Sequence, residues 1–156
     1  MTWGNGDQGQ LGRIPMRSTR RGDYMRMTML RPTIIPGCRS IVFEDAFCGS
    51  SSTFLKDASG RFFACGLNNC GQCAIPLANE IPNMDAATLE DRVRSMVTLL
   101  HPTEVQALAA LEMNKIAPGE THAIGVNEDN CVYSWGAPRH GNLGRFEVEG
   151  MVTEFT

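Results

Sequence analysis

The sequence predicts an all-β protein built from repeated units, and two observations lead to this prediction. A Gly-rich pattern occurs three times, beginning at Trp3, Cys65 and Trp135. Short apolar runs separated by polar turns precede the second and third copies, as expected for strands joined in hairpins. Because a long internal repeat sets the architecture, the fold follows from the repeated unit rather than from any single element.

The repeat extends upstream of its second and third copies. When Gly49 is placed on Gly119, segment 47–55 aligns with 117–125 and segment 57–66 aligns with 127–136, and no gap is needed. An alignment without gaps over both segments indicates that they form the same local structure.

The sequence of each unit predicts four strands, three that follow one another and a fourth, outer strand ahead of them. The first of the three covers 40–47 in one unit and 114–117 in the other. The second and third form a hairpin around a turn of Asp, Asn, Ser and Gly, residues that suit tight turns. A fourth, outer strand is expected ahead of these three, at 32–35 or 102–108. Four strands per unit is the make-up of a propeller blade. The hairpin strands are 53–55 with 61–65 and 123–126 with 131–135.

A short amphipathic helix is expected between the units, at residues 85–100. Asp85 can cap its start, and His101 and Pro102 would end it. The apolar stretch 107–111 could extend the helical signal, which leaves the boundary with the outer strand open. The helix would either pack on the rim of the fold or bind a partner. Its apolar residues at helical spacing are Leu89, Val93, Met96, Val97 and Leu100.

With these residues in view, the pattern resembles the repeat of the regulator of chromosome condensation (RCC1) family, over 3–73 and 102–144. Segments 8–13 and 42–49 resemble the central blades of its founding member. The resemblance implies a partial β-propeller, with about two complete four-stranded blades and incomplete ends of a seven-bladed ring. A whole ring needs roughly 350 residues, so a fragment is expected. The structural repeat positions are Gly49, Gly66, Gly71, Gly119, His122, Trp135, Gly136, Gly141 and Gly144.

These expectations divide the chain into six parts. They are the end of a blade (1–12), a long Arg- and Met-rich arm with an outer strand (13–39), a blade (40–73), an insertion with the helix (74–101), a second blade (102–144) and the start of a further blade (145–156).

The resemblance implies guanine-nucleotide exchange on the small GTPase Ran at chromatin, in the nucleus; without it, a cytoplasmic location would be expected. An exchange factor uses its binding energy to lower the affinity of the GTPase for its nucleotide, and it breaks no covalent bond. The chain is therefore not expected to be an enzyme or to need a cofactor. The expected partners are Ran and, through the parent protein, histones or chromatin. A membrane or a small-molecule substrate is not expected. The alternative is a non-exchanging scaffold for protein interactions, built from the same repeat.

The resemblance also suggests where a GTPase would touch the chain. The turns at 49–52 and 119–122 match those that line one face of the family's ring. The family's functional histidine falls at Thr121, which cannot become charged, so this chain alone is expected to lack exchange activity. His122 is expected to be structural. The candidate contacts are Glu120, Thr121, Ser51 and Arg13.

Composition agrees with a globular protein that has no general affinity for nucleic acid. Hydrophobic residues make up 42%, charged residues 20%, and the net charge is −3. Nothing resembles a signal peptide or a membrane span. The first arm carries a local basic cluster, either a solvated loop or a contact for phosphate or an acidic partner. Its members are Arg13, Arg17, Arg20, Arg21, Arg26 and Arg31.

Two motifs with known chemistry are better explained by the repeat. Gly4, Gly6 and Gly9 match a dinucleotide-binding spacing, but that motif needs a strand before it and a helix after it, and neither is expected here. Cys65, Cys70 and Cys73 have a metal-like spacing, yet Cys65 stands where Trp3 and Trp135 stand. Cys73 likewise takes the place of a leucine. Both cysteines are therefore expected in the core, and no metal is expected.

Overall fold

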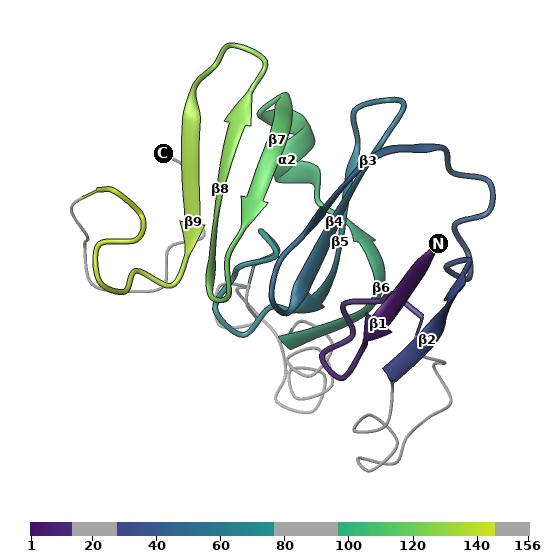
Figure 1. Cartoon of the computed structure of the whole chain (residues 1–156). Coiled ribbons are helices and arrows are strands. Elements are labelled where there is room, and N and C mark those ends of the chain that lie inside the picture. Colours follow the sequence, from purple (N-terminus) through teal and green to yellow (C-terminus); the bar gives the residue numbers. More distant parts are fainter. Residues whose placement is uncertain (14–27, 77–96, 146–156) are drawn as a thin grey trace, which may run out of the picture.

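In the described part of the chain, the regular structure consists of three antiparallel sheets and a short helix. The computed structural model describes residues 1–13, 28–76 and 97–145. Figure 1 shows the sheets side by side, with one short helix, α2 (Gln106–Ala110), beside β7. We call the sheets blades A, B and C. Blade A pairs β1 (Thr2–Asn5) with β2 (Thr28–Thr33). In blade B the strands lie in the order β3 (Phe43–Cys48), β4 (Ser52–Asp57), β5 (Phe62–Leu67) and β6 (Thr98–Glu104). In blade C the order is β7 (Met113–Pro118), β8 (His122–Asn127) and β9 (Val132–Gly136).

Blades B and C are the same structural unit, and their strands pair in the same register. Ala46 pairs with Leu55 in blade B, and the equivalent Ile116 pairs with Gly125 in blade C. The turn between the first two strands closes through one backbone hydrogen bond in each blade, from Gly49 N to Ser52 O and from Gly119 N to His122 O, both 2.8 Å long. The shared register confirms the alignment without gaps. The predicted hairpins are confirmed as well, because β4 pairs with β5 and β8 pairs with β9.

The outer strand follows its blade in the sequence, so its predicted place ahead of the blade is wrong. β6 pairs with β5, and β2 pairs with β1. Residues 98–104 complete blade B because they supply the backbone partners that the outer edge of β5 needs. His101 and Pro102 lie within β6 and do not end a helix. Proline is tolerated there because β6 is an edge strand and Pro102 needs no ladder donor.

The helix expected at 85–100 lies mostly outside the described residues. Its last part is not helical, because 98–100 belongs to β6. The helical signal at 107–111 is confirmed by α2, which buries Leu108 completely.

Of the arm's predicted basic cluster, only Arg13 and Arg31 lie within the described ranges. No helix in those ranges is long and apolar enough to cross a membrane.

The main core lies between blades B and C. Phe54 and Phe62 from blade B meet Met113 and Trp135 from blade C, and Leu108 closes the cluster from α2. The rings of Phe54 and Trp135 are 6.4 Å apart and meet edge to face at 79°. This arrangement buries one face of each blade against the next. A smaller cluster of Ile35, Leu55 and Phe63 covers the other face of blade B.

The cysteine-rich loop is part of this packing. Cys65 and Cys73 are fully buried, which confirms their predicted core positions. Cys65 Sγ donates to Gln10 O at 3.4 Å, just as its counterpart Trp135 donates from Nε1 to Gln72 O at 3.2 Å. Burial raises the pKa of the Cys65 thiol to about 12, so it stays protonated and unreactive near neutral pH.

The first Gly-rich loop is a series of turns. Gly9 N donates to Gly6 O at 3.0 Å and Gly12 N donates to Gly9 O at 2.9 Å. A short strand, β1, does precede this loop, contrary to expectation. The chain nevertheless does not enter a helix in residues 6–12, so the helix N-terminus that a dinucleotide site needs is not formed.

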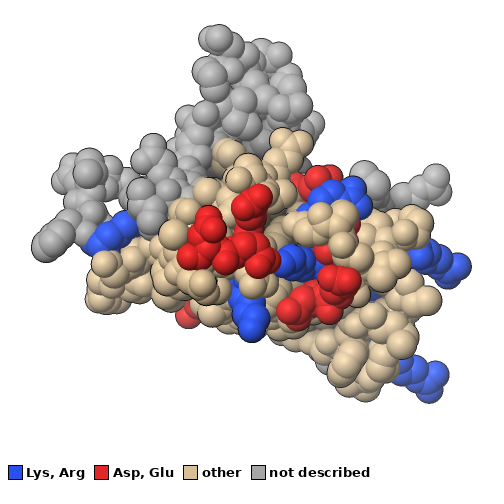
Figure 2. Space-filling model, turned by 90° about the horizontal axis from the view of Figure 1, so that it is seen from above, with Lys and Arg blue, Asp and Glu red and all other residues tan. Residues whose placement is uncertain are grey.

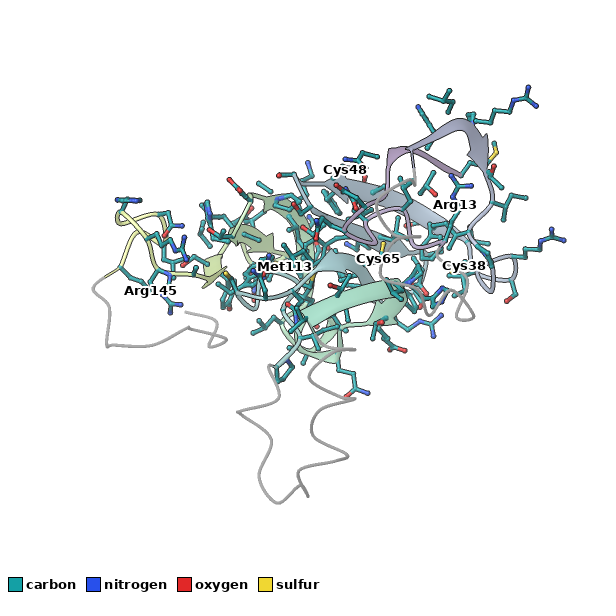
Figure 3. All side chains as sticks on the ribbon, turned by 90° about the horizontal axis from the view of Figure 1, so that it is seen from below. Arg13, Cys38, Cys48, Cys65, Met113 and Arg145 are labelled. Atoms are coloured by element: carbon teal, nitrogen blue, oxygen red, sulfur yellow. The ribbon has the colours of Figure 1, made fainter. Side chains whose placement is uncertain are left out.

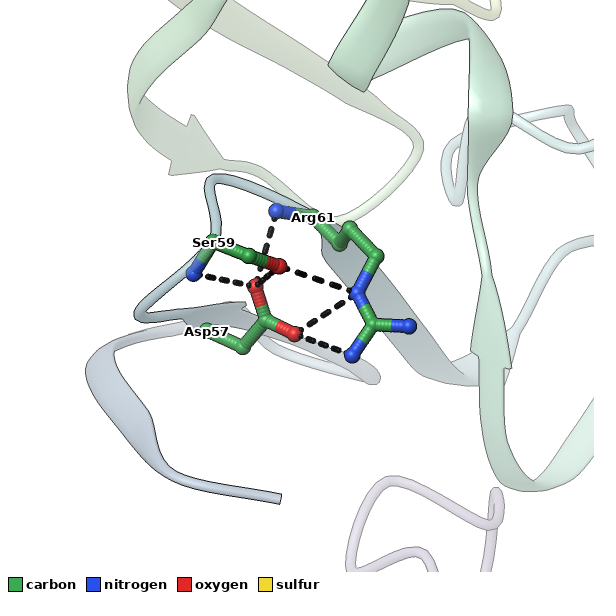
Figure 4. A network of polar contacts seen from close by, with 3 residues as sticks. All are labelled: Asp57, Ser59 and Arg61. Atoms are coloured by element: carbon green, nitrogen blue, oxygen red, sulfur yellow. Dashed lines mark hydrogen bonds and ion pairs between the residues drawn. The ribbon is translucent and has the colours of Figure 1, made fainter.

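A buried aspartate holds the β4–β5 turn (Figure 4). Asp57 Oδ1 accepts from Ser59 N, Ser59 Oγ and Arg61 N at 2.9, 2.7 and 2.9 Å. Its Oδ2 accepts from Arg61 Nε at 2.8 Å and pairs with Nη2 at 2.7 Å. Burial alone would raise the pKa of Asp57, but the hydrogen bonds from Ser59 and Arg61 outweigh burial and lower it from 3.8 to about 2. The turn is thus held by an ionised carboxylate.

Asp57→Asn is expected to remove an acid-sensitive part of the stability. Because the folded pKa lies below the unfolded one, this contribution is present at neutral pH and is lost as the pH falls from about 4 towards 2. The amide should still form the turn, since the equivalent Asn127 Oδ1 accepts from Cys131 N at 2.8 Å. Urea unfolding at pH 7 and at steps down to pH 2 measures the effect. An equal loss of stability in both proteins across this window would contradict it.

Candidate protein-binding face

The turns that carry three predicted contact residues lie side by side at one end of the sheets. The β3–β4 turn holds Ser51, and the β7–β8 turn holds Glu120 and Thr121. A Cβ added at Gly49 would lie 2.9 Å from the Cβ of Pro118, so the first turn rests directly on the start of the second. The structure therefore brings together candidates that lie in different repeats of the chain.

The loop that follows β5 ties these turns together. Gln72 is almost fully buried and donates from Nε2 to Glu120 O at 3.5 Å and to Asn69 Oδ1 at 3.0 Å. Its Oε1 accepts from Cys70 N at 2.8 Å. The backbone of Glu120 is thereby fixed from the neighbouring blade, while the Glu120 side chain is exposed and Ser51 and Thr121 are half-buried.

Sequence reasoning missed this role of the loop amides. The position of Gln72 is filled by Gln10 in the first copy of the loop and by Asn142 in the third. Gln10 Oε1 accepts from Gln8 N and Asn142 Oδ1 accepts from Arg139 N, both at 2.9 Å. The sequence does contain a signal for this role, because an amide side chain directly follows a glycine in all three copies of the loop.

The remaining predicted residues are placed differently. His122 is half-buried, and its ring lies against the turn, since a Cβ at Gly119 would come within 2.8 Å of His122 Cε1. Its structural role stays a prediction. Arg13 is only 9% exposed, and its Nε and Nη2 have no hydrogen-bond partner among the described residues. Figure 3 shows Arg13 and Cys38 at one side of the molecule and Arg145 at the other. Arg13 offers a partner far less surface than Glu120 does.

The opposite end of the sheets has a different character. Figure 2 views that end from above and shows acidic side chains gathered on it. Glu128 lies there in the β8–β9 turn, and its Oε1 is 3.6 Å from Lys56 Nζ. Glu128 therefore provides an exposed carboxylate for comparison with Glu120, away from the predicted contact turns.

Comparison with known proteins identifies the repeat. Residues 2–55 match the model of the Regulator of chromosome condensation (RCC1) repeat. Protein pim1 of Schizosaccharomyces pombe is 32% identical over 143 residues, which cover 92% of this chain and 22% of that protein. The Probable E3 ubiquitin-protein ligase HERC6 of Homo sapiens is 25% identical over 144 residues, which cover 92% of this chain and 11% of that protein.

Solved structures share the fold. The structure of Prp20p from Saccharomyces cerevisiae superposes with a TM-score of 0.67 at 18% identity, covering 99% of this chain and 32% of Prp20p. A second solved structure names Prp20 as yeast RCC1. This chain thus spans about a third or less of the length of each of these proteins. Residues 2–55 therefore match the RCC1 repeat, and blades A to C have the fold of part of a β-propeller like that of Prp20p.

Proposed function

We propose that the chain contributes a protein-binding face to an RCC1-type propeller and that the partner of this face is the small GTPase Ran. The main support is the contact of Gly49 with Pro118, which sets two predicted contact turns side by side. The similar Prp20p is described as having binding properties to Gsp1p and histones. By the same resemblance, we place the parent protein in the nucleus, at chromatin.

The chemistry of the face suits binding rather than exchange. Glu120 can accept hydrogen bonds from, or pair with, a basic side chain of the partner, and the Ser51 and Thr121 hydroxyl groups can donate or accept. A charge at the edge of an interface mainly sets association rate and specificity. Thr121 supplies no charge that could compete for the nucleotide phosphates. The chain is therefore expected to bind Ran without accelerating nucleotide release.

Glu120→Lys is expected to weaken Ran binding by about tenfold, equivalent to about 1.4 kcal/mol, because it reverses the charge facing a basic partner group. Glu128→Lys is the matched control and should leave binding unchanged, since it lies at the other end of the sheets. Binding is measured by titrating immobilised chain with Ran that carries a fluorescent guanine nucleotide. Nucleotide release is followed in the same samples and should proceed at the intrinsic rate.

The outcomes separate the parts of the proposal. If the wild-type chain does not bind Ran, the partner is wrong. If both lysine variants bind equally well, the partner stands but the face is wrong. Faster nucleotide release would contradict the inference drawn from Thr121.

The second candidate function is a non-exchanging interaction scaffold. It is favoured by the neutral Thr121 and by the similarity to HERC6, which is named as a probable ubiquitin ligase rather than an exchange factor. Absence of Ran binding by a folded chain is the result that this alternative requires.

A further inference from the structure

Gln72 contacts the predicted binding face from inside the molecule. The residue is 1% exposed, so its polar groups need partners within the protein. Its Oε1 accepts from Cys70 N at 2.8 Å, and its Nε2 donates to Asn69 Oδ1 at 3.0 Å. The amide nitrogen carries a second hydrogen, and the acceptor for it is Glu120 O, at 3.5 Å. The loop after β5 in blade B therefore holds the β7–β8 turn of blade C through one amide group.

The backbone of Gln72 is bonded to the core of the same junction. Its carbonyl oxygen accepts from Trp135 Nε1 at 3.2 Å, and Trp135 is completely buried. Because the main chain and the side chain of Gln72 are both held, the residue has little freedom to follow a movement of the turn. The position of Glu120 O thus depends on the packing between blades B and C as well as on the turn that carries it.

The equivalent glutamine of blade A bonds within its own loop. Gln10 holds the same repeat position as Gln72, and its Oε1 likewise accepts from the backbone two residues earlier, from Gln8 N at 2.9 Å. Its Nε2 donates to Asp7 Oδ1 of the same loop at 3.5 Å. In the described part of the chain, no side-chain hydrogen bond joins Gln10 to the β3–β4 turn of blade B. The repeat therefore accounts for closure of the loop, whereas the bond to the next blade is made by Gln72 and not by Gln10.

The side chain of Glu120 has no support of its own. Glu120 is exposed, and among the described residues its carboxylate makes no hydrogen bond or ion pair. Only the backbone of the turn therefore limits where the carboxylate points. A contact group that is already held in its bound geometry costs less conformational entropy on binding, and residues behind a site supply that order.

We propose that Gln72 is a positioning residue of the binding face, which holds the β7–β8 turn so that the Glu120 carboxylate is presented to the partner in one orientation. The inference rests on the proposed function, in which Glu120 contacts Ran. It adds to that function a dependence on a buried residue of the neighbouring blade, which lies outside the turns that touch the partner.

Amide hydrogen exchange of the chain tests the positioning without any partner. Gly119 N and Gly49 N donate equivalent hydrogen bonds across the two turns, so each amide reports the opening of its own turn. In Gln72→Leu, we expect exchange at Gly119 to be about threefold to tenfold faster, the factor that one lost hydrogen bond produces. Exchange at Gly49 should be unchanged. A faster rate at both amides by the same factor, or at neither, would overturn the proposal.

Gln10→Leu is the matched control, because it removes the same loop-closing acceptor from blade A. Since Gln10 does not bond to the β3–β4 turn, exchange at Gly49 should remain at the wild-type rate in this variant. If Gln10→Leu accelerated Gly49 as strongly as Gln72→Leu accelerates Gly119, closure of the loop would be the cause, and the role assigned to the Glu120 contact would be wrong.

A double-mutant cycle with Ran shows whether Gln72 acts through Glu120. Gln72→Leu should weaken Ran binding by about threefold to tenfold, measured by titrating the immobilised chain. In a Glu120→Ala background it should have little further effect, because the group that it positions is absent. Gln10→Leu should leave the affinity unchanged in both backgrounds. An equal loss from Gln72→Leu in both backgrounds would show that Gln72 supports the fold in general and has no positioning role.

The two measurements fail separately. If the wild-type chain does not bind Ran, the proposed function is wrong, and the exchange rates at Gly119 and Gly49 still decide whether Gln72 holds the turn. If Ran binds but Gln72→Leu changes neither the affinity nor the exchange at Gly119, the partner stands and the positioning role is wrong.

Discussion

Replacing Trp135 with alanine is expected to lower the free energy of unfolding by about 3–5 kcal/mol. The side chain is completely buried, and its ring meets Phe54 edge to face across the interface between blades B and C. Its Nε1 donates to Gln72 O at 3.2 Å, so the substitution also removes a buried hydrogen bond. Since small domains are stable by only about 5–15 kcal/mol, the loss is a large part of the total stability. Urea denaturation followed by circular dichroism measures it.

Trp3→Ala is the matched control, because Trp3 occupies the same repeat position. Its side chain is 60% exposed, and truncation leaves no cavity in the core. We expect a change within about 0.5 kcal/mol, as for surface substitutions in general. Similar losses for the two variants would show that the interface between blades B and C is not the main source of stability.

Gly66→Ala is expected to lower the free energy of unfolding by about 3 kcal/mol or more, from two additive causes. Gly66 has φ +117°, a backbone conformation that costs other residues about 1–3 kcal/mol. The added Cβ would also overlap the Ser51 carbonyl oxygen and lie 2.7 Å from Ser52 Cα. That carbonyl is fixed because it accepts from Leu67 N at 2.8 Å, so neither backbone can move aside freely.

Gly4→Ala separates the two causes. Gly4 stands at the same repeat position with φ +107°, yet nothing lies within 4 Å of a Cβ added there. It should therefore show only the conformational cost, about 1–3 kcal/mol. The difference between the two urea midpoints reports the overlap with the β3–β4 turn. If Gly66→Ala were no worse than Gly4→Ala, the turn would be more adaptable than its hydrogen bonds indicate.

The residue pattern was sufficient to predict the repeated unit. The alignment of Gly49 with Gly119 correctly matched β3, β4 and β5 with β7, β8 and β9, because strand and turn signals are local. It also identified Cys65 as a core residue, since a buried position repeats with the unit even when Trp becomes Cys. The positions of the two turns at Ser51 and Glu120 followed from the same spacing, whereas their role as contacts was inferred from the family resemblance and stays a prediction.

Strand pairing between segments far apart in the chain could not be predicted in the same way. β5 ends at Leu67 and β6 begins only at Thr98. The sequence of β6 does not indicate whether this strand completes the blade before it or begins the next blade. The burial of Arg13 was equally inaccessible, because an arginine in a basic cluster is usually exposed. Both depend on which surfaces meet after the chain folds.

The sequence by itself therefore determined the unit and its period, because these depend on side chains within one hairpin and its turn. Only the tertiary structure decided which strand closes each blade, that Gly49 and Pro118 press two turns into one face, and that Trp135 is buried while Trp3 is not. The physical reason is that the two tryptophans have the same local sequence pattern, whereas burial depends on the segments that pack against the side chain. Phe54 of blade B and Gly125 of β8 lie against Trp135, whereas Trp3 is 60% exposed among the described residues.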